Sequence, residues 1–289
     1  MTLVLQISDP HFGTEQLAVA RALTQLVRDQ TPGVLVLSGD ITQRARAAQF
    51  EAARRFVDAL AIPLRLTLPG NHDIPLFNPY ARLFTPYANY LKAFGPDLQP
   101  VLETASLLAI SVNTTRWWRH KNGEVSPAQI EQVAERLRKA SPSQLRLIVI
   151  HQPVHVLRQE DVHDRLRGHD AAMRAWAAAG ADIIMGGHIH LPYVCALHDD
   201  VAGLARRIWC VQAGTALSSR VRKEAPNSVN LLRFWADRQP LCCHAEQWDF
   251  HAASGRFEMV QRSELMLDRS ECAQFSVGAA VASDPNEAC

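Results

Sequence analysis

Five short clusters of acidic, amide and imidazole side chains each follow a short apolar run of the chain. The clusters are Asp9-Pro10-His11, Ser38-Gly39-Asp40, Pro69-Gly70-Asn71-His72-Asp73, His151, and Gly186-Gly187-His188-Ile189-His190. Carboxylate and amide oxygens combined with imidazole nitrogens, without cysteine, suit Mn²⁺, Fe or Zn²⁺ better than softer metals. Side chains at i and i+2 of an extended segment point to the same side, so Asp9 with His11 can converge on one point.

Each cluster alone also has an ordinary structural interpretation. Asp9 or Asp40 can cap a turn or a helix, and His151 can be a buried, hydrogen-bonded core residue. Together the clusters favour a site for two adjacent metal ions with Asp40 shared between them, built from Asp9, His11, Asp40, Asn71, His151, His188 and His190. Within the third cluster, His72 can act as an acid or base and Asp73 can orient it.

Strands and helices alternate along the part of the chain that carries these clusters. Apolar runs predict strands over residues 3–7, 34–37, 64–68, 107–112, 145–150, 183–185 and 208–211, and helical periodicity predicts helices over 15–29, 45–60, 126–139 and 170–179. Ser126 followed by Pro127 is a typical helix start. This alternation predicts an α/β layered domain, in which ligands bind outside the carboxyl ends of the strands.

The pattern changes after Ser228. Residues 229–234, 241–248 and 257–260 read as consecutive strands, which predicts an antiparallel addition that packs on the first sheet as a second sheet. The segment could also form a dimer contact. We expect one domain over residues 1–270 and a flexible tail over 271–289.

Composition narrows the class of protein. The chain has 289 residues, 47% of them hydrophobic, 12 histidines and a formal net charge of +1. This balance gives no reason to expect a nucleic-acid polymer as partner. No apolar stretch approaches the roughly 20 residues that span a bilayer, and the first residues lack the features of a signal peptide. These features predict a soluble cytoplasmic enzyme without a membrane partner, with reduced cysteines and a small-molecule substrate; a homodimer remains an open possibility.

The five clusters, in this order and each after a strand, resemble the signature of the calcineurin-like metallophosphoesterase superfamily. The resemblance runs from Asp9 to His190, about two thirds of the chain. It implies a metallo-dependent phosphatase fold, a four-layer α/β/β/α sandwich of two mixed sheets flanked by helices. It also implies two metal ions, the first held by Asp9, His11, Asp40 and His190, and the second held by Asp40, Asn71, His151 and His188. His72 would contact the substrate phosphate and protonate the leaving group, and Asp73 would orient His72.

The motif forms indicate a branch of this superfamily. The chain lacks the Arg before Gly70 and the Asp-Arg pair after Asp40 that are typical of the protein phosphatases. Its Gly-Asp-Ile-Thr and Pro-Gly-Asn-His-Asp forms resemble the bacterial class III cyclic-nucleotide phosphodiesterases more closely. We therefore expect a phosphodiesterase that hydrolyses a small organic phosphate, with a 3′,5′-cyclic nucleotide as one candidate, by attack of a metal-bridging hydroxide. Arg116, Trp117 and Arg220 are the candidate substrate contacts.

Other functions fit the same clusters. Two metals serve a phosphomonoesterase, or a nucleotide or lipid-linked pyrophosphatase, equally well. A clustered apolar rim would favour a lipid, and a single anion-binding pocket would favour monoesters. A non-catalytic interaction module on the same fold is a further alternative, and the complete set of candidate ligands argues against it.

Overall fold

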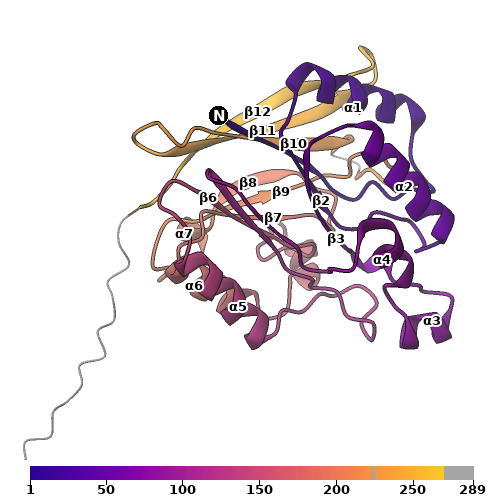
Figure 1. Cartoon of the computed structure of the whole chain (residues 1–289), viewed down its shortest axis with the longest axis horizontal. Helices are drawn as coiled ribbons and strands as arrows, with labels where there is room; N and C mark the ends of the chain where they lie inside the picture. The colour runs from indigo at the N-terminus through magenta and orange to yellow at the C-terminus, as the bar shows by residue number, and fades with distance from the viewer. Residues whose placement is uncertain (223–224, 270–289) are drawn as a thin grey trace, which may run out of the picture.

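Two six-stranded mixed sheets form the centre of the computed structural model, which describes residues 1–222 and 225–269 (Figure 1). The first sheet has the strand order β12-β11-β10-β1-β2-β3 and the second has the order β4-β5-β6-β7-β9-β8. The strands are β1 Thr2–Ile7, β2 Val34–Ser38, β3 Leu64–Leu68, β4 Val101–Glu103, β5 Leu107–Ser111, β6 Leu145–Val149, β7 Ile183–Gly186, β8 Tyr193–Ala196, β9 Trp209–Gln212, β10 Ser228–Phe234, β11 Cys242–His251 and β12 Arg256–Met266.

Helices cover the outer face of each sheet (Figure 1). The first sheet is covered by α1 Leu17–Gln30, α2 Ala47–Ala59 and α4 Ala88–Phe94, and the second by α5 Pro127–Arg138 and α6 His169–Ala179. Shorter elements are η1 Asn71–Asp73, α3 Pro79–Phe84, η2 Gln159–Asp164 and α7 Leu197–Asp200. The helices expected from periodicity are therefore present, and α5 begins at Ser126 and Pro127 as expected.

Three apolar cores explain the four layers. Along β1, Leu3, Leu5 and Ile7 pack toward the helices, whereas Val4 packs between the two sheets. Successive side chains of a strand point to opposite faces, so a strand that is buried on both sides must be apolar throughout. This is why the central strands appear in the sequence as uninterrupted apolar runs. The α/β/β/α arrangement expected from the sequence is confirmed.

The strands after Ser228 correct one expectation. They are antiparallel, but they extend the first sheet and do not form the second. β10 pairs with the free edge of β1, with Thr2 opposite Phe234, and β11 and β12 continue outward from β10. The second sheet consists of β4–β9. The physical reason is that β10 buries both of its faces at this edge, with Leu231 in the helix-side core and Leu232 in the core between the sheets.

Three further expectations concern the C-terminal tail, membrane-spanning helices and the cysteines. The expected tail at residues 271–289 lies outside the described residues. Within residues 1–222 and 225–269, no helix combines the length and apolar composition needed to cross a bilayer. Four of the six cysteines fall in this part of the chain, namely Cys195, Cys210, Cys242 and Cys243, and all four are free thiols.

Tyr90 of α4 offers a test of packing on the first sheet. Its ring is fully buried and its hydroxyl lies 3.1 Å from Oγ1 of Thr67. Burial raises the pKa of Tyr90 above its ordinary value of 10.0. The protonated phenol therefore stabilises the fold fully below pH 10, and this contribution is lost as the pH rises above 10.

We expect Tyr90→Phe to lower the free energy of unfolding by about 1 kcal/mol at pH 8, because Thr67 loses its partner. Above pH 10 the difference from the native chain should shrink, since the variant has no phenol to ionise. Urea unfolding at pH 8 and pH 11 measures both values. A difference that stays constant with pH would contradict the buried-phenol explanation.

Candidate metal centre

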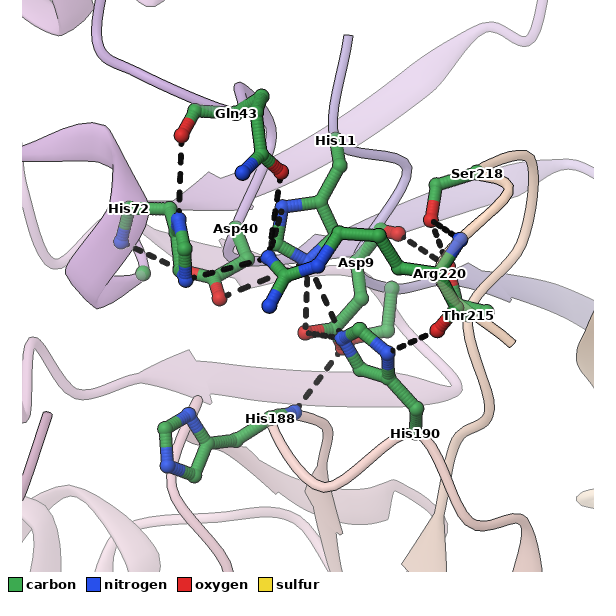
Figure 2. Close-up of polar contacts among 12 residues, drawn as sticks. Asp9, His11, Asp40, Gln43, His72, His188, His190, Thr215, Ser218 and Arg220 are labelled. Atoms are coloured by element: carbon green, nitrogen blue, oxygen red, sulfur yellow. Dashed lines mark hydrogen bonds and ion pairs between the residues drawn. The ribbon is translucent and has the colours of Figure 1, made fainter. Parts of the chain in front are cut away.

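The carboxyl ends of strands from both sheets meet at one edge, and the candidate side chains converge there. Asp9 and His11 follow β1, Asp40 follows β2, and Asn71 and His72 lie in η1 after β3. His151 follows β6, and His188 and His190 follow β7. Figure 2 shows that residues from both sheets face one another at this point.

The backbone at these positions is strained. Among the described residues, eight that are not glycine have positive φ, and five of them are Asp9 at 50°, His11 at 43°, Asp40 at 47°, His188 at 75° and His190 at 54°. Such angles are uncommon for residues with a Cβ and cluster at functional sites. The packing of the strand ends must hold these residues in place.

Two glycines permit the close approach of the strand ends. A Cβ on Gly70 would collide with the backbone nitrogen and the carboxylate of Asp40. A Cβ on Gly187 would collide with the hydroxyl of Ser8 and come within 2.5 Å of Oδ2 of Asp9. These glycines therefore bring the loops together around the two carboxylates.

The first group of candidate ligands is Asp9, His11 and His190. The ligand atoms of these three buried residues all lie within 4.8 Å of one another. Nε2 of His190 is 3.2 Å from Oδ1 of Asp9 and 3.1 Å from Nε2 of His11. Nε2 of His11 is also 3.8 Å from Oδ2 of Asp40, so Asp40 borders this group.

The second group is Asp40, His151 and His188, again with ligand atoms within 4.8 Å of one another. Nε2 of His151 lies 3.2 Å from Oδ1 of Asp40. Asp40 therefore lies between the two groups, as expected for a shared carboxylate. Asn71 sits beside Asp40 in the cleft wall, and its Oδ1 is buried.

Backbone carbonyls fix two of the imidazoles. Nδ1 of His151 lies 2.9 Å from the carbonyl oxygen of Ser38, and Nδ1 of His190 lies 2.7 Å from that of Arg220. Each carbonyl can accept only if Nδ1 carries a proton, so Nε2 is the nitrogen that faces the other candidate ligands and is available to a metal ion. A partner on the far nitrogen is the usual way to orient a metal-binding histidine.

The site fits cations because several buried polar atoms have no hydrogen-bond partner. They include Oδ1 of Asp9, Oδ1 of Asn71, Nε2 of His151 and both ring nitrogens of His188. Buried polar atoms are normally paired, and an unpaired one is costly. Each of these atoms has a lone pair or can present one, and the atoms converge on one place. A hard or borderline metal ion requires such a set of oxygen and nitrogen ligands.

The electrostatics agree with this fit. Burial raises the pKa of Asp9, but the neighbouring His190 outweighs burial and lowers the value to about 2. Burial lowers the pKa of His11 to about 3. Burial also lowers the pKa of His151, but Asp40 outweighs it and raises the value to about 9. Asp40 and His151 therefore bind a proton strongly between them, and the same two groups would bind a metal ion in its place.

His72 lies at the entrance to the site, but its partner is not the expected one. Nδ1 of His72 is 3.1 Å from the carbonyl oxygen of Gln43, and its Nε2 is 3.2 Å from Nη1 of Arg220 (Figure 2). Asp73 instead accepts hydrogen bonds from the backbone of Gly70, Ile41 and Thr42 and from the Thr42 hydroxyl. Asp73 thus fixes the two loops that carry Asp40 and His72, and the Gln43 carbonyl orients the His72 ring.

A cleft of about 810 Å³ opens above these residues, and only one of the three candidate substrate contacts borders it. Arg220 lines the cleft. Arg116 is absent from its lining because the guanidinium turns toward α5, where it donates to Oε1 of Gln129 and to backbone carbonyls. Trp117 packs edge-to-face against Trp118 and is also absent from the lining.

The structure adds residues that the motifs did not indicate. Gln43 contacts both His72 and Arg220, and the Ser8 hydroxyl donates to Oδ2 of Asp9. Asp164 of η2 approaches His188. Ser8 precedes the first cluster directly and could have been noticed there, whereas the path of the loop that brings Asp164 to His188 leaves no signal in the sequence.

The fold and the two groups of ligands define a class of metal-dependent phosphoesterases. The chain belongs to the calcineurin-like phosphoesterase family, whose model matches residues 2–192. Members of this family use two metal ions, and the two groups of buried ligands correspond to two such sites.

A curated relative is a cAMP/cGMP dual specificity phosphodiesterase of Mycobacterium tuberculosis (strain CDC 1551 / Oshkosh). It is 26% identical over 164 residues, which cover 55% of this chain and 49% of the relative. The aligned part thus spans about half the length of that curated relative.

Solved structures share the fold. A purple acid phosphatase from yellow lupin seeds matches with a TM-score of 0.68 at 13% identity over 93% of this chain and 54% of its own. A dimetal phosphatase from Danio rerio matches with a TM-score of 0.60 at 14% identity over 92% of this chain and 99% of its own. GAP50, described as the anchor in the inner membrane complex of Plasmodium, also matches at 0.60, with 12% identity over 94% of this chain and 90% of its own. At these identities the likeness shows the fold alone.

Proposed function

We propose that the chain is a binuclear metal-dependent phosphodiesterase acting on a small organic phosphate. The observation that carries this proposal is the convergence of two groups of buried ligand atoms, several of them without a hydrogen-bond partner, on the floor of the cleft beside His72. Asp9, His11 and His190 would hold one ion, Asn71, His151 and His188 the other, and Asp40 would serve both. Mn²⁺, Fe or Zn²⁺ suits this donor set.

Two ions held there would supply a water of lowered pKa and neutralise the phosphate oxygens. The chain's own residues do the rest. Arg220 faces the same point as His72 and would bind a phosphate oxygen. His72, oriented by the Gln43 carbonyl, directs Nε2 toward the cleft and would give a proton to the departing alkoxide.

The charges around the cleft favour a diester. Lys121 is paired with Asp164 at 2.7 Å and Arg222 with Asp161 at 2.9 Å, so carboxylates already balance both cations. Arg220 instead turns toward His72, with its Nη1 also 3.1 Å from Oε1 of Gln43. Arg44 also lines the cleft, with its guanidinium 5.0 Å from the centre of the Phe77 ring, so Arg220 is the cation that lies beside His72. Besides the metals, a single cation beside His72 suits the single charge of a diester better than the double charge of a monoester. The phosphodiesterase relative supports the same choice, and a 3′,5′-cyclic nucleotide is the substrate class to test first.

The test compares bis(p-nitrophenyl) phosphate with p-nitrophenyl phosphate, using protein stripped of metal by a chelator and reloaded with Mn²⁺. We expect hydrolysis that depends on added metal and a higher kcat/KM for the diester. Hydrolysis of cAMP and cGMP by the same preparations follows. Faster turnover of the monoester would support the phosphomonoesterase alternative. Absence of any turnover by protein carrying two ions per chain would remove support for a broad phosphodiesterase.

A further inference from the structure

Asp164 is a buried carboxylate outside the five motif clusters. It ends η2, in the long segment between β6 and α6, and its side chain reaches the wall of the cleft. Its Oδ1 lies 3.6 Å from Nε2 of His188. Lys121 contacts both oxygens of this carboxylate, with Nζ 2.7 Å from Oδ1 and 2.9 Å from Oδ2, and Nε2 of His163 lies 3.4 Å from Oδ2.

His188 differs from His151 and His190 in the way it is oriented. His151 and His190 each have a backbone carbonyl beside Nδ1. Both ring nitrogens of His188 are buried and without a hydrogen-bond partner, and the polar group beside Nε2 is Asp164. A metal-binding histidine needs a partner on its far nitrogen to fix its tautomer and ring angle.

We propose that Asp164 is the positioning residue for His188: it accepts the Nε2 proton and thereby presents Nδ1 as a lone pair toward Asp40 and His151. The 3.6 Å separation is longer than a hydrogen bond, so this role requires a small rotation of the His188 ring toward Asp164. Lys121, from the loop after β5, holds the carboxylate in place. The proposal rests on the metal-binding role given to His188 above.

The ion pair with Lys121 agrees with this role. A carboxylate held by an ammonium group can accept a hydrogen bond from the imidazole and increase the basicity of the ring toward a cation. The ion pair with Lys121 offsets the cost of burying this charge.

The test is metal binding, which is independent of the substrate. Chelator-stripped protein is titrated with Mn²⁺ by calorimetry, and the product is measured by electron paramagnetic resonance. We expect Asp164→Asn to weaken one of the two ions by about 10–100-fold and to leave the other unchanged. At limiting Mn²⁺, the native chain should give the spectrum of a coupled pair of ions, and Asp164→Asn should give the spectrum of an isolated ion.

The matched control is Asp161→Asn. Asp161 lies in the same short helix, is 6% exposed against 5% for Asp164, and is likewise paired with a cation, Arg222. Among the described residues, no hydrogen bond or ion pair joins Asp161 to His188. We expect this variant to bind two ions with native affinities. An equal loss in both variants would mean that η2 has collapsed, and the proposal would fail.

A second variant guards against misfolding of the first. Lys121 is 47% exposed, so Lys121→Gln should fold, and it removes the ion pair but keeps the carboxylate. We expect it to weaken the same ion, by less than Asp164→Asn does. Native affinities for both ions in Asp164→Asn, or an unchanged affinity in Lys121→Gln when Asp164→Asn does not fold, would overturn the proposal. If the native chain itself binds fewer than two ions, the two-metal proposal fails instead.

Discussion

The His72→Ala variant is expected to lose about 10²–10⁴-fold in kcat/KM on a diester whose leaving group is an alkoxide, and to keep two bound metal ions. His72 is not in either group of ligands, and its Nε2 points at the cleft beside Arg220. An alkoxide needs a proton as it departs, and in the proposed mechanism His72 supplies it. p-Nitrophenolate leaves without a proton, so the loss on bis(p-nitrophenyl) phosphate should be smaller.

The measurement is a comparison of kcat/KM for the two classes of diester, with metal content determined for each preparation. His120→Ala is the control, because His120 is a histidine of the same cleft that does not contact Arg220 or Gln43 in the structure. Equal losses on both diesters would show that His72 binds the phosphate and does not protonate the leaving group. Loss of metal from His72→Ala would show that the residue supports the ligands.

The Asp40→Asn variant should lose the paired centre and at least about 10³-fold in activity, since electrostatic stabilisation by metals amounts to several kcal/mol. Asp40 lies 3.2 Å from His151 and 3.8 Å from His11, so it lies between the two groups of ligands. Asn keeps the shape and the hydrogen bond from the His72 backbone nitrogen to Oδ1, 2.8 Å in the native chain. The substitution removes only the negative charge and one of the two oxygen atoms that can bind a metal ion.

Metal analysis after dialysis measures this effect, with Asp161→Asn as the control for loss of a buried charge nearby. We expect the native chain and the control to retain two ions and Asp40→Asn to retain no more than one. Two tightly held ions in Asp40→Asn would contradict the shared role of this carboxylate.

The sequence predicted the elements that are buried on both faces. Strands such as β2 and β6 are apolar at nearly every position, and α5 carries both apolar periodicity and a cap at Ser126. The elements missed were short or exposed. β4 has three residues, β8 has four, and α3 has six with none buried, so none shows a period long enough to detect.

The placement of the last strands depended on pairing between residues far apart in the chain. Thr2 lies opposite Phe234, and the apolar sequence of β10 fits an edge of either sheet. The edge that β10 joins depends on how its side chains fit the two cores on either side of the first sheet. That fit involves residues distant in the chain, so the local sequence does not indicate it. The interpretation of residues 229–260 as a second sheet therefore failed although the strands themselves were found.

The sequence indicated the position of the candidate ligands better than that of the candidate substrate contacts. Asp9, His11, His188 and His190 follow strands directly, so the sheet fixes where they lie. Arg116 lies on a loop, and a loop side chain is directed by whatever partner it meets. Arg116 met Gln129 of α5. Side-chain type alone could not indicate this outcome.

The division of the ligands between the two sheets has a consequence for motion. Asp9, Asp40 and Asn71 extend from the first sheet, and His151 and His190 from the second, with direct contacts such as His151 to Ser38 across the gap. Ions bound by both sets would cross-link two layers whose contact is made largely by apolar side chains. Loading with metal should therefore slow amide hydrogen exchange at the carboxyl ends of β1, β2, β6 and β7 together, while α1 and α5 exchange as before.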